Sequence, residues 1–385
     1  MIILKGEFNL EERTENILRK LINTNTTNPP GNEIDAIRTI LSFFPKEVDY
    51  EIIDHGDNRG SLLMEIKGKD EEKIGFIGHL DTVPVSDKSS WIYPPFDGVI
   101  EEGYMYGRGT SDMKGGVTAM ILTALYFIEN NITPPHTLKF VFTADEESGG
   151  IGVQALRNKG LLEDIAKVFI AEPSDEKIGI CEKGALWLNI YVKGKSAHGS
   201  KPELGINAIE KLYEYINRLK DIIDLDESHS LLGEPSFAIT LIHGGVKTNI
   251  IPEEANASVD IRTIPGFDHD EILRKAFSIG KSMEEENIGM SMEIQVENNR
   301  PPLTMDEEDV FIKDIIKTYE KLFYPVEFKG INFYTDASQL IPFHNIPFVI
   351  LGPGEENMCH QRNERIKIES IIRMTKFYIS YITNS

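Results

Sequence analysis

Two residues that could do chemistry together, His79 and Asp81, follow a short apolar run at 74–77. Such a run predicts a buried strand, and positions i and i+2 of a strand point to the same side, so the imidazole and the carboxylate would project together. Sheets of the α/β class bind ligands at strand ends, and a carboxylate beside a metal-binding histidine fixes its tautomer and raises its basicity. Taken alone, the pair fits a structural contact better than a metal site, so the metal prediction depends on further ligands.

An aspartate in a glycine-rich loop is the next candidate ligand. Asp112 lies in the run G-R-G-T-S-D-M-K-G-G, which ends just before a dense apolar pattern at 117–128 that predicts a buried helix. An aspartate that caps this helix is the ordinary interpretation, but a cap needs no pair of glycines on each side. A phosphate-binding P-loop is not indicated, because the spacing from G-x-G to a lysine followed by serine or threonine is wrong.

Carboxylates also follow two other predicted strands. The strand at 138–143 leads into Asp145-Glu146-Glu147, and the strand at 167–171 ends in Glu172. Consecutive acids at the end of a buried strand cost free energy unless a positive charge lies beside them. A solvated surface turn is the alternative, and the strand context and the glycines that follow argue against it.

A second histidine, His360, follows the apolar strand predicted at 348–351. Two imidazoles with carboxylates suit Zn²⁺, and Co²⁺ or Mn²⁺ fit the same ligands. A catalytic zinc keeps about three protein ligands and one open position, so five ligands predict two metals that share one carboxylate. Each metal would take one histidine and one terminal acid, with Asp112 bridging. The candidate ligands are His79, Asp112, Glu147, Glu172 and His360.

This ligand set leaves one acid, Glu146, free beside the predicted metals. A carboxylate near a metal-activated water is a general base that takes the proton of that water and later passes it to a leaving nitrogen. The sequence has no G-x-S-x-G motif, and neither cysteine lies in a known Cys/His catalytic context. The chemistry that these residues predict is therefore metal-dependent hydrolysis of an acyl bond.

The elements that would position these residues fall into two predicted domains, as a length of 385 residues suggests. Strands alternate with helices up to about residue 184 and again after 298, which predicts an α/β catalytic domain over 1–184 and 298–385 with a mostly parallel sheet. Between them, 185–297 shows the order β-α-β-β-α-β. This order predicts an inserted ferredoxin-like α+β domain with an antiparallel sheet.

Composition bounds the partners and the location of the protein. The formal net charge of −22 argues against a nucleic acid or an anionic membrane as partner. No apolar run is long enough to span a membrane, and no signal peptide is expected at the N-terminus. Only two cysteines occur, which favours a reducing cytoplasm over a disulfide-forming compartment.

Five motifs resemble one known family, in its order and nearly from end to end. They are G-H-L-D-T-V-P-V, G-R-G-T-S-D-M-K-G-G, T-A-D-E-E-S-G-G, A-E-P-S-D and the late C-H-Q. The chain resembles the co-catalytic zinc metallopeptidase family of acetylornithine deacetylase, succinyl-diaminopimelate desuccinylase, aminoacylase and glutamate carboxypeptidase.

The resemblance implies a role for each motif residue. His79 and Glu172 would hold one zinc, Glu147 and His360 the other, and Asp112 would bridge them. Asp81 would orient His79, and Glu146 would be the acid/base. The inserted domain would be a lid that often forms a homodimer. The residues of that domain expected to bind substrate are His198, which would stabilise the oxyanion, and Asn249 and Arg262.

The expected reaction is removal of the acyl group from a small N-acyl amino acid. The stretch L-G-P-G before His360 resembles acetylornithine deacetylases more than desuccinylases, and Glu182-Lys183-Gly184 stands where desuccinylases have adjacent arginines. A dipeptidase or carboxypeptidase on the same di-metal site is the alternative. A non-catalytic metal-binding or ligand-binding protein is the alternative of another class, and the intact ligands and base argue against it.

Overall fold

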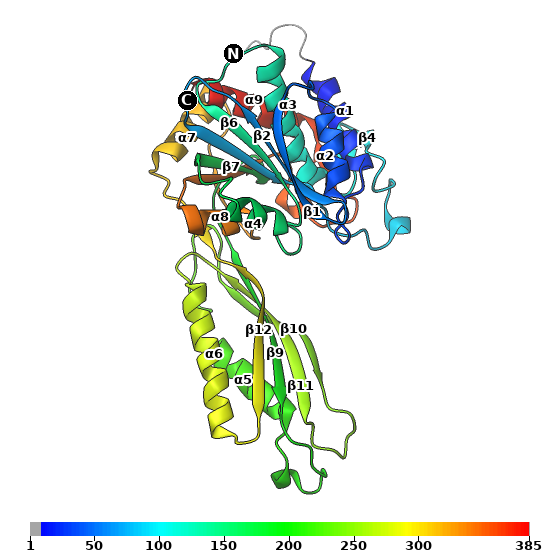
Figure 1. Cartoon of the computed structure of the whole chain (residues 1–385), viewed down its shortest axis with the longest axis vertical. Coiled ribbons are helices and arrows are strands. Elements are labelled where there is room, and N and C mark those ends of the chain that lie inside the picture. The colour runs from blue at the N-terminus through cyan, green and yellow to red at the C-terminus, as the bar shows by residue number, and fades with distance from the viewer. Residues whose placement is uncertain (1–8, 385) are drawn as a thin grey trace. The chain divides into compact units, whose positions relative to one another are not determined.

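The computed structural model describes residues 9–384, which divide into two compact units (Figure 1). The first unit runs to Cys181 and continues over Thr304–Ile331 and from Thr335 onward. The second unit comprises Glu182–Leu303 with Asn332–Tyr334. Residues 1–8, where no signal peptide was expected, and residue 385 lie outside the described residues. The inserted domain was predicted to span 185–297, and these boundaries remain a prediction.

The first unit is built on a nine-stranded sheet of order β1-β2-β6-β3-β7-β15-β8-β13, with β14 paired to β8. Its four central strands, β6, β3, β7 and β15, are parallel, and antiparallel strands flank them. The mixed α/β class with a parallel central sheet is therefore confirmed. The strands are β1 (Asp49–Gly56), β2 (Arg59–Ile66), β3 (Lys73–His79), β6 (Thr137–Thr143), β7 (Ile165–Pro173), β8 (Ile178–Glu182), β13 (Leu303–Thr304), β14 (Phe328–Ile331) and β15 (Phe348–Gly352).

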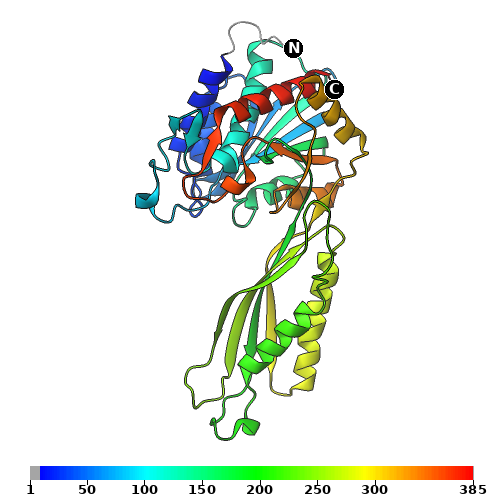
Figure 2. The same ribbon diagram turned by 180° about the vertical axis from the view of Figure 1, so that it is seen from behind.

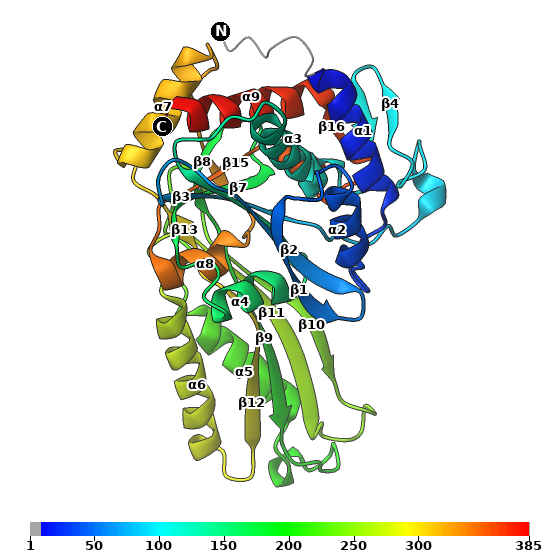
Figure 3. The ribbon, with the colours of Figure 1, turned by 45° about the horizontal axis from the view of Figure 1, so that its top comes forward.

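Helices cover both faces of this sheet, so its parallel strands are buried on both sides, as such strands require (Figures 1 and 3). In these views α1, α2, α3 and α9 lie over one face, and α4 and α8 lie over the other. The helices are α1 (Leu10–Asn23), α2 (Glu33–Leu41), α3 (Gly115–Glu129), α4 (Ile151–Asn158), α7 (Val310–Lys321), α8 (Ala337–His344) and α9 (Ile368–Asn384). None of the helices in the described part of the chain is both long and apolar enough to cross a membrane.

Aromatic side chains in register join the parallel strands to α9. Phe76 pairs with Phe140 and with Phe169 across the ladder, and the rings stack with centroids 5.2 and 5.0 Å apart. Tyr381 of α9 meets the Phe169 ring edge-on at 4.9 Å. Such contacts add to the free energy of burial and fix the strands relative to the C-terminal helix.

A small sheet brings the last part of the chain back beside the glycine-rich loop. Its order is β16-β5-β4, with β4 at Val99–Glu101, β5 at Tyr104–Tyr106 and β16 at Arg365–Lys367. The pairing of β16 with β5 is antiparallel. Because β5 leads into the loop of Asp112 and β16 follows His360, this sheet holds two distant ligand segments next to each other.

The second unit has one antiparallel sheet of order β10-β11-β9-β12 with two helices on one face (Figures 1 and 2). Its elements are β9 (Gly184–Lys193), α5 (Ala208–Lys220), β10 (Ser236–Gly244), β11 (Glu254–Thr263), α6 (His269–Glu286) and β12 (Ser291–Arg300). Burial alternates along β11, so one face of the strand packs on the helices and the other does not. The predicted β-α-β-β-α-β arrangement is confirmed.

Candidate metal centre

Two predicted ligands lie at neighbouring strand ends of the central sheet. His79 is the last residue of β3 and pairs with Thr143, the last residue of β6. Glu172 lies near the end of β7, the other neighbour of β3. Their side chains are almost fully buried, with 1% exposed for His79 and 3% for Glu172. Because parallel strands end at the same edge of a sheet, the topology alone brings this imidazole and this carboxylate together.

Asp112 reaches the same edge from an irregular turn before α3. The turn spans Thr110–Lys114 and follows Gly109, whose φ of 85° lies in the left-handed region that favours glycine. Asp112 has extended φ and ψ of −117° and 96°, and the residue that precedes α3 is Lys114. The interpretation of Asp112 as an ordinary helix cap is therefore wrong. The glycines allow the chain to turn so that this carboxylate points at the strand ends.

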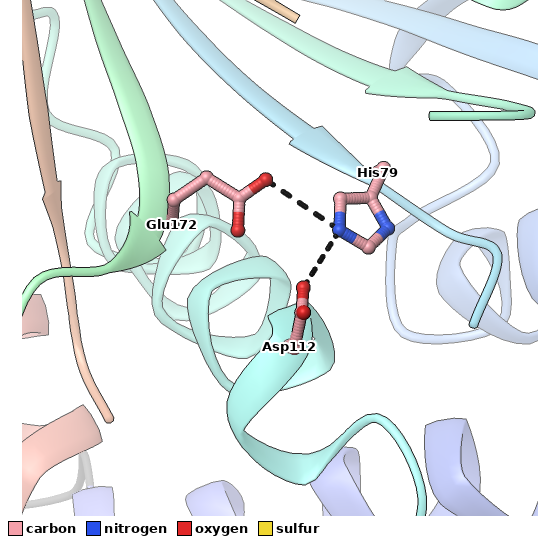
Figure 4. Close-up of side chains that lie close together, drawn as sticks. All are labelled: His79, Asp112 and Glu172. Atoms are coloured by element: carbon pink, nitrogen blue, oxygen red, sulfur yellow. Dashed lines mark hydrogen bonds and ion pairs between the residues drawn. The ribbon is translucent and has the colours of Figure 1, made fainter. Parts of the chain in front are cut away.

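The two carboxylate oxygens of Asp112 face different histidines. Its Oδ1 lies 3.0 Å from Nε2 of His79, which is also 3.5 Å from Oε1 of Glu172 (Figure 4). Its Oδ2 lies 3.2 Å from Nε2 of His360, which is 2.9 Å from Oε2 of Glu147. Within each group the potential ligand atoms lie within 4.8 Å of one another. We call His79, Asp112 and Glu172 the first ligand group, and Asp112, Glu147 and His360 the second.

The first and second ligand groups fit divalent metal ions. Oε1 of Glu147 and Oε2 of Glu172 are buried and accept no hydrogen bond among the described residues, so each has an oxygen ready for a cation. Burial raises the pKa of Glu147 to about 7, and repulsion from Asp112 adds to the shift. Burial also raises the pKa of Glu172 well above its ordinary value. Acids crowded in this way need a positive charge beside them, and bound dications supply the largest local charge available.

The two histidines carry that positive charge when no metal is bound. Hydrogen bonds with Asp112 and Glu147 raise the pKa of His360 to about 11. Burial alone would lower the pKa of His79, but the neighbouring Glu172 and Asp112 raise it well above its ordinary value. Protons and metals therefore compete for the same imidazole nitrogens.

Asp81 contacts His79 in a different way from the one expected. Nδ1 of His79 lies 3.0 Å from the backbone carbonyl oxygen of Asp81 and 3.7 Å from its carboxylate. A proton on Nδ1 that is donated to this carbonyl leaves Nε2 free to bind metal. The carboxylate instead accepts the backbone N–H groups of Glu146 and Glu147 at 3.1 and 3.2 Å. That the Asp81 carboxylate orients His79 stays a prediction. The structure shows instead that this carboxylate contacts the turn that carries Glu146 and Glu147.

Glu146 lies in that turn beside the first ligand group. It is buried, with 6% exposed, and burial raises its pKa well above the ordinary value while the charge of His79 opposes the shift. A carboxylate of raised pKa takes and returns a proton more readily near neutral pH, so the position suits a general base. That role stays a prediction.

A buried network that the sequence patterns did not reveal supports the same turn. Asp145 has a positive φ of 69° and accepts from Asn28 at 2.8 Å and from Arg59 at 2.7 Å. Asn28 also donates to Asp81 at 2.9 Å, and Arg59 is paired with the buried Glu33. The network ties the turn of Glu146 and Glu147 to the loop before α2 and to β2. A loop asparagine and a strand arginine give no periodic signal, so only the fold identifies them.

The three residues expected to bind substrate lie in the second unit. His198 is exposed, and its Nδ1 accepts the backbone N–H of Ser200 at 3.1 Å, so the ring proton lies on Nε2 and can be donated outward. The backbone N–H of Gly199 donates to the carbonyl of Asn249 at 2.9 Å, which joins the two loops. Arg262 makes a bidentate contact with Asp260 at 2.8 and 3.0 Å. Their roles toward substrate stay predictions.

Comparisons with known proteins show which sequences this chain is similar to. The sequence pattern of "Peptidase family M20/M25/M40" matches residues 75–384. A "Probable succinyl-diaminopimelate desuccinylase" of Staphylococcus aureus is 28% identical over 94% of this chain and 95% of its own length. An uncharacterised metallohydrolase of Methanocaldococcus jannaschii is 31% identical, with 86% of this chain and 85% of that protein covered.

Solved structures share the fold. The aminopeptidase PepT of Bacillus cereus superposes with a TM-score of 0.76 at 22% identity, covering 97% of this chain and 98% of that one. A dinuclear metal-binding peptidase of Bacillus subtilis superposes with a TM-score of 0.69 at 18% identity, with the same coverage. The family match spans most of the chain. The chain therefore belongs to peptidase family M20/M25/M40 and is a metal-dependent hydrolase of amide bonds.

Proposed function

We propose that the protein is a di-metal deacylase that removes the acyl group from a small N-acyl amino acid. The observation that carries this proposal is that Asp112 joins two ligand groups, with the buried Glu146 at the edge of the first. Five ligands from histidine and carboxylate suit two zinc ions, and Co²⁺ or Mn²⁺ fit the same donors. The desuccinylase name of the Staphylococcus relative supports an acyl amino acid as substrate.

Each catalytic residue has a task in this proposal. When bound, the two ions polarise the scissile carbonyl and lower the pKa of the attacking water. Glu146 takes the proton of that water and returns it to the leaving nitrogen, and its raised pKa suits both transfers. Asp81 holds the turn of Glu146 through its backbone N–H. The family resemblance gives His198 the role of donating Nε2–H to the oxyanion that forms on the carbonyl.

Arg262 and Asn249 bind the substrate in this proposal. The Asp260 carboxylate covers the edge formed by Nε and Nη2 of Arg262, so the carboxylate of the amino acid would bind on the Nη1 side. Asn249 would bind a substrate oxygen beside His198, because their loops are joined. These assignments follow the family resemblance.

A substrate panel tests the proposal. The metal-loaded protein would be assayed on N-acetyl and N-succinyl amino acids and on dipeptides and tripeptides, after bound metal has been counted by elemental analysis. We expect two zinc ions per chain and a higher kcat/KM on the acyl amino acids. A preference for dipeptides would instead support the dipeptidase or carboxypeptidase alternative, and no turnover by the two-metal protein would support a binding protein.

We also propose a homodimer that forms through the second unit. β10 is at the edge of its sheet, and Ile239, Leu241 and Ile242 on it are exposed. An exposed apolar edge strand is a template for pairing with another chain, and a second copy offers the same edge. Sedimentation should show a dimer that Leu241→Lys weakens. A monomeric wild type would refute the dimer and leave the deacylase proposal intact.

The proposed location is the cytoplasm. Cys181 is buried, Cys359 is partly buried, and no disulfide joins these two cysteines of the sequence. Cysteines that stay reduced suit a reducing compartment. Fractionation of cells that express the protein would test this location.

A further inference from the structure

A buried carboxylate that the proposed mechanism does not use, Glu364, faces the loop of Asp112. Its side chain is 0% exposed. Oε1 accepts the backbone N–H groups of Ser111 at 2.8 Å and of Asp112 at 3.0 Å. Oε2 accepts the backbone N–H of Gly109 at 2.9 Å and Nη1 of Arg108 at 2.7 Å. All four donors belong to the loop that presents Asp112 to both ligand groups.

The irregular backbone of this loop explains why a carboxylate is needed there. Asp112 and Met113 have non-helical dihedrals, so the turn lacks the regular hydrogen bonds of a helix, and the loop is buried. Buried N–H groups must find acceptors or they destabilise the fold. Glu364 supplies acceptors for three of them at once and so fixes the path of the loop. The N–H of Asp112 itself is one of the three.

The same side chain belongs to the segment of His360. Glu364 lies four residues after His360, and its backbone carbonyl accepts the N–H of Gly107 at 2.9 Å. Arg108 donates to the carbonyl oxygens of Gln361 at 3.3 Å and of His360 at 3.5 Å. Two ligand segments about 250 residues apart are thus joined by one buried ion pair.

We propose that Glu364, with Arg108, is a positioning residue that sets the spacing between Asp112 and His360 and thereby determines metal binding at the second ligand group. The inference rests on the proposed di-metal site. The first ligand group depends less on this contact, because His79 and Glu172 lie on adjacent hydrogen-bonded strands. His360 lies in a loop with a positive φ of 61°, where no strand ladder places it.

The variant Glu364→Gln tests the proposal with little change in size. Its amide NH₂ would face the N–H donors of the loop or of Arg108, so at least one contact becomes repulsive. We expect zinc affinity at the second ligand group to fall about 10–100-fold, the range found for residues that orient metal ligands, while the first zinc stays bound. The kcat should fall at low zinc and recover when zinc is added in excess. Zinc titration by calorimetry and elemental analysis after dialysis would measure both sites.

The matched control is Glu65→Gln, far along the sheet from the ligands. Glu65 is a partly buried carboxylate that pairs with Lys73 at 2.8 Å and with Lys139 at 3.3 Å, toward the start of β6. It should keep both zinc sites. If Glu364→Gln does not fold, Arg108→Lys keeps the charge beside Glu364 but loses the fork that reaches the His360 carbonyl, and a weaker second site is again expected.

Each outcome decides the proposal. Wild-type affinity at both sites in Glu364→Gln, or equal loss at both, would overturn it, since the second result is what general loosening of the fold gives. A wild type that binds fewer than two zinc ions would overturn the di-metal site itself. A wild type that binds two but hydrolyses no substrate in the panel would refute the proposed reaction alone, because the test of Glu364 measures metal binding.

Discussion

The first and second ligand groups share Asp112 but differ in how deeply they are buried. In the first group His79 is only 1% exposed, and Glu172 is buried beside it. In the second group the side chain of His360 is 54% exposed, although the Glu147 carboxylate that it contacts is buried. One half of the proposed metal centre is therefore enclosed by the sheet, and the other half opens to solvent.

The difference follows from the elements that supply the ligands. Strand ends of a parallel sheet position His79 and Glu172, so the backbone hydrogen bonds of the core hold them in place. Turns position Glu147 and His360, and each turn contains a residue of positive φ, Asp145 or His360 itself. Buried side chains support these turns where no ladder can. The fold thus holds the first ligand group through the strand ladder, whereas the second ligand group depends on side-chain contacts.

Removal of Asp112 is expected to have the largest effect, because this residue belongs to both ligand groups. Asp112→Ala should weaken both sites and lower kcat/KM by at least about 1,000-fold, a loss of more than about 4 kcal/mol in transition-state stabilisation. Elemental analysis and steady-state kinetics would measure this. Asp97→Ala, at an exposed position in a loop, is the control. Retention of two metals by Asp112→Ala would show that the groups are independent.

The next effect separates catalysis from metal binding. Glu146→Gln should lower kcat by about 10²–10⁴-fold, the usual contribution of a general base, while two metals stay bound. The neighbouring Glu147→Gln should instead lose affinity at the second ligand group, since His360 would keep only Asp112 as a close partner. The two variants differ by one position in the same turn. Full activity of Glu146→Gln with both metals bound would refute the base assignment.

The sequence predicted well those features of the site that depend on periodicity and topology. Apolar runs that end in His79 or Glu172 identify strands, and strands that alternate with helices imply that their ends meet at one edge. The structure does bring His79 and Glu172 together at that edge, with Nε2 and Oε1 3.5 Å apart. The expected antiparallel sheet of the second unit was found for the same reason, because the alternation along β11 follows the strand period.

The residues that support the turns could not be predicted in this way. Asn28, Arg59 and Glu364 act through hydrogen bonds whose partners are 26 to 256 residues away. Such contacts depend on loop paths and on individual N–H directions, which leave no repeat in the sequence. The Asp81 carboxylate is another example. Its spacing from His79 suggested a contact with that imidazole, but in the structure the carboxylate mainly accepts backbone N–H groups from the turn of Glu146.

A third prediction concerns the support of that turn. Arg59→Met would remove the cation between Asp145 and the buried Glu33. The kcat should fall about 10–100-fold, the usual loss for residues that orient metal ligands without contacting the metal. The free energy of unfolding should fall by about 3–5 kcal/mol, because Glu33 would be a buried charge without its partner. Arg38→Met, at a mostly exposed pair with Asp35, is the control for both measurements. Unchanged kcat in a destabilised Arg59→Met would show that the network supports only the fold.

Removal of the metals would test whether the more exposed second ligand group releases its ion before the buried first ligand group does. When the cobalt-loaded protein is mixed with a chelator, we expect two phases, with the ion of the second ligand group leaving first because His360 is exposed. Activity should be lost with that first ion. His360→Ala should show only the slow phase, and its starting content should be one ion per chain. Simultaneous release of both ions from the wild type would mean that exposure does not determine the order.

The smallest effect expected is a pH dependence of the metal-free protein. Hydrogen bonds with Asp112 and Glu147 raise the pKa of His360 from 6.5 to about 11. A pKa that is higher in the folded state stabilises the fold fully below the unfolded value, and that stabilisation is lost as pH rises through the folded value. The melting temperature of the metal-free protein should therefore fall between about pH 7 and pH 10, whereas bound metal replaces the proton and should remove much of this slope.

His360→Gln should flatten the profile of the metal-free protein, and the control His243→Gln, exposed in the second unit, should not. An equally steep slope in His360→Gln would assign the effect to His79 and the first ligand group, whose imidazole pKa is raised by its own carboxylates.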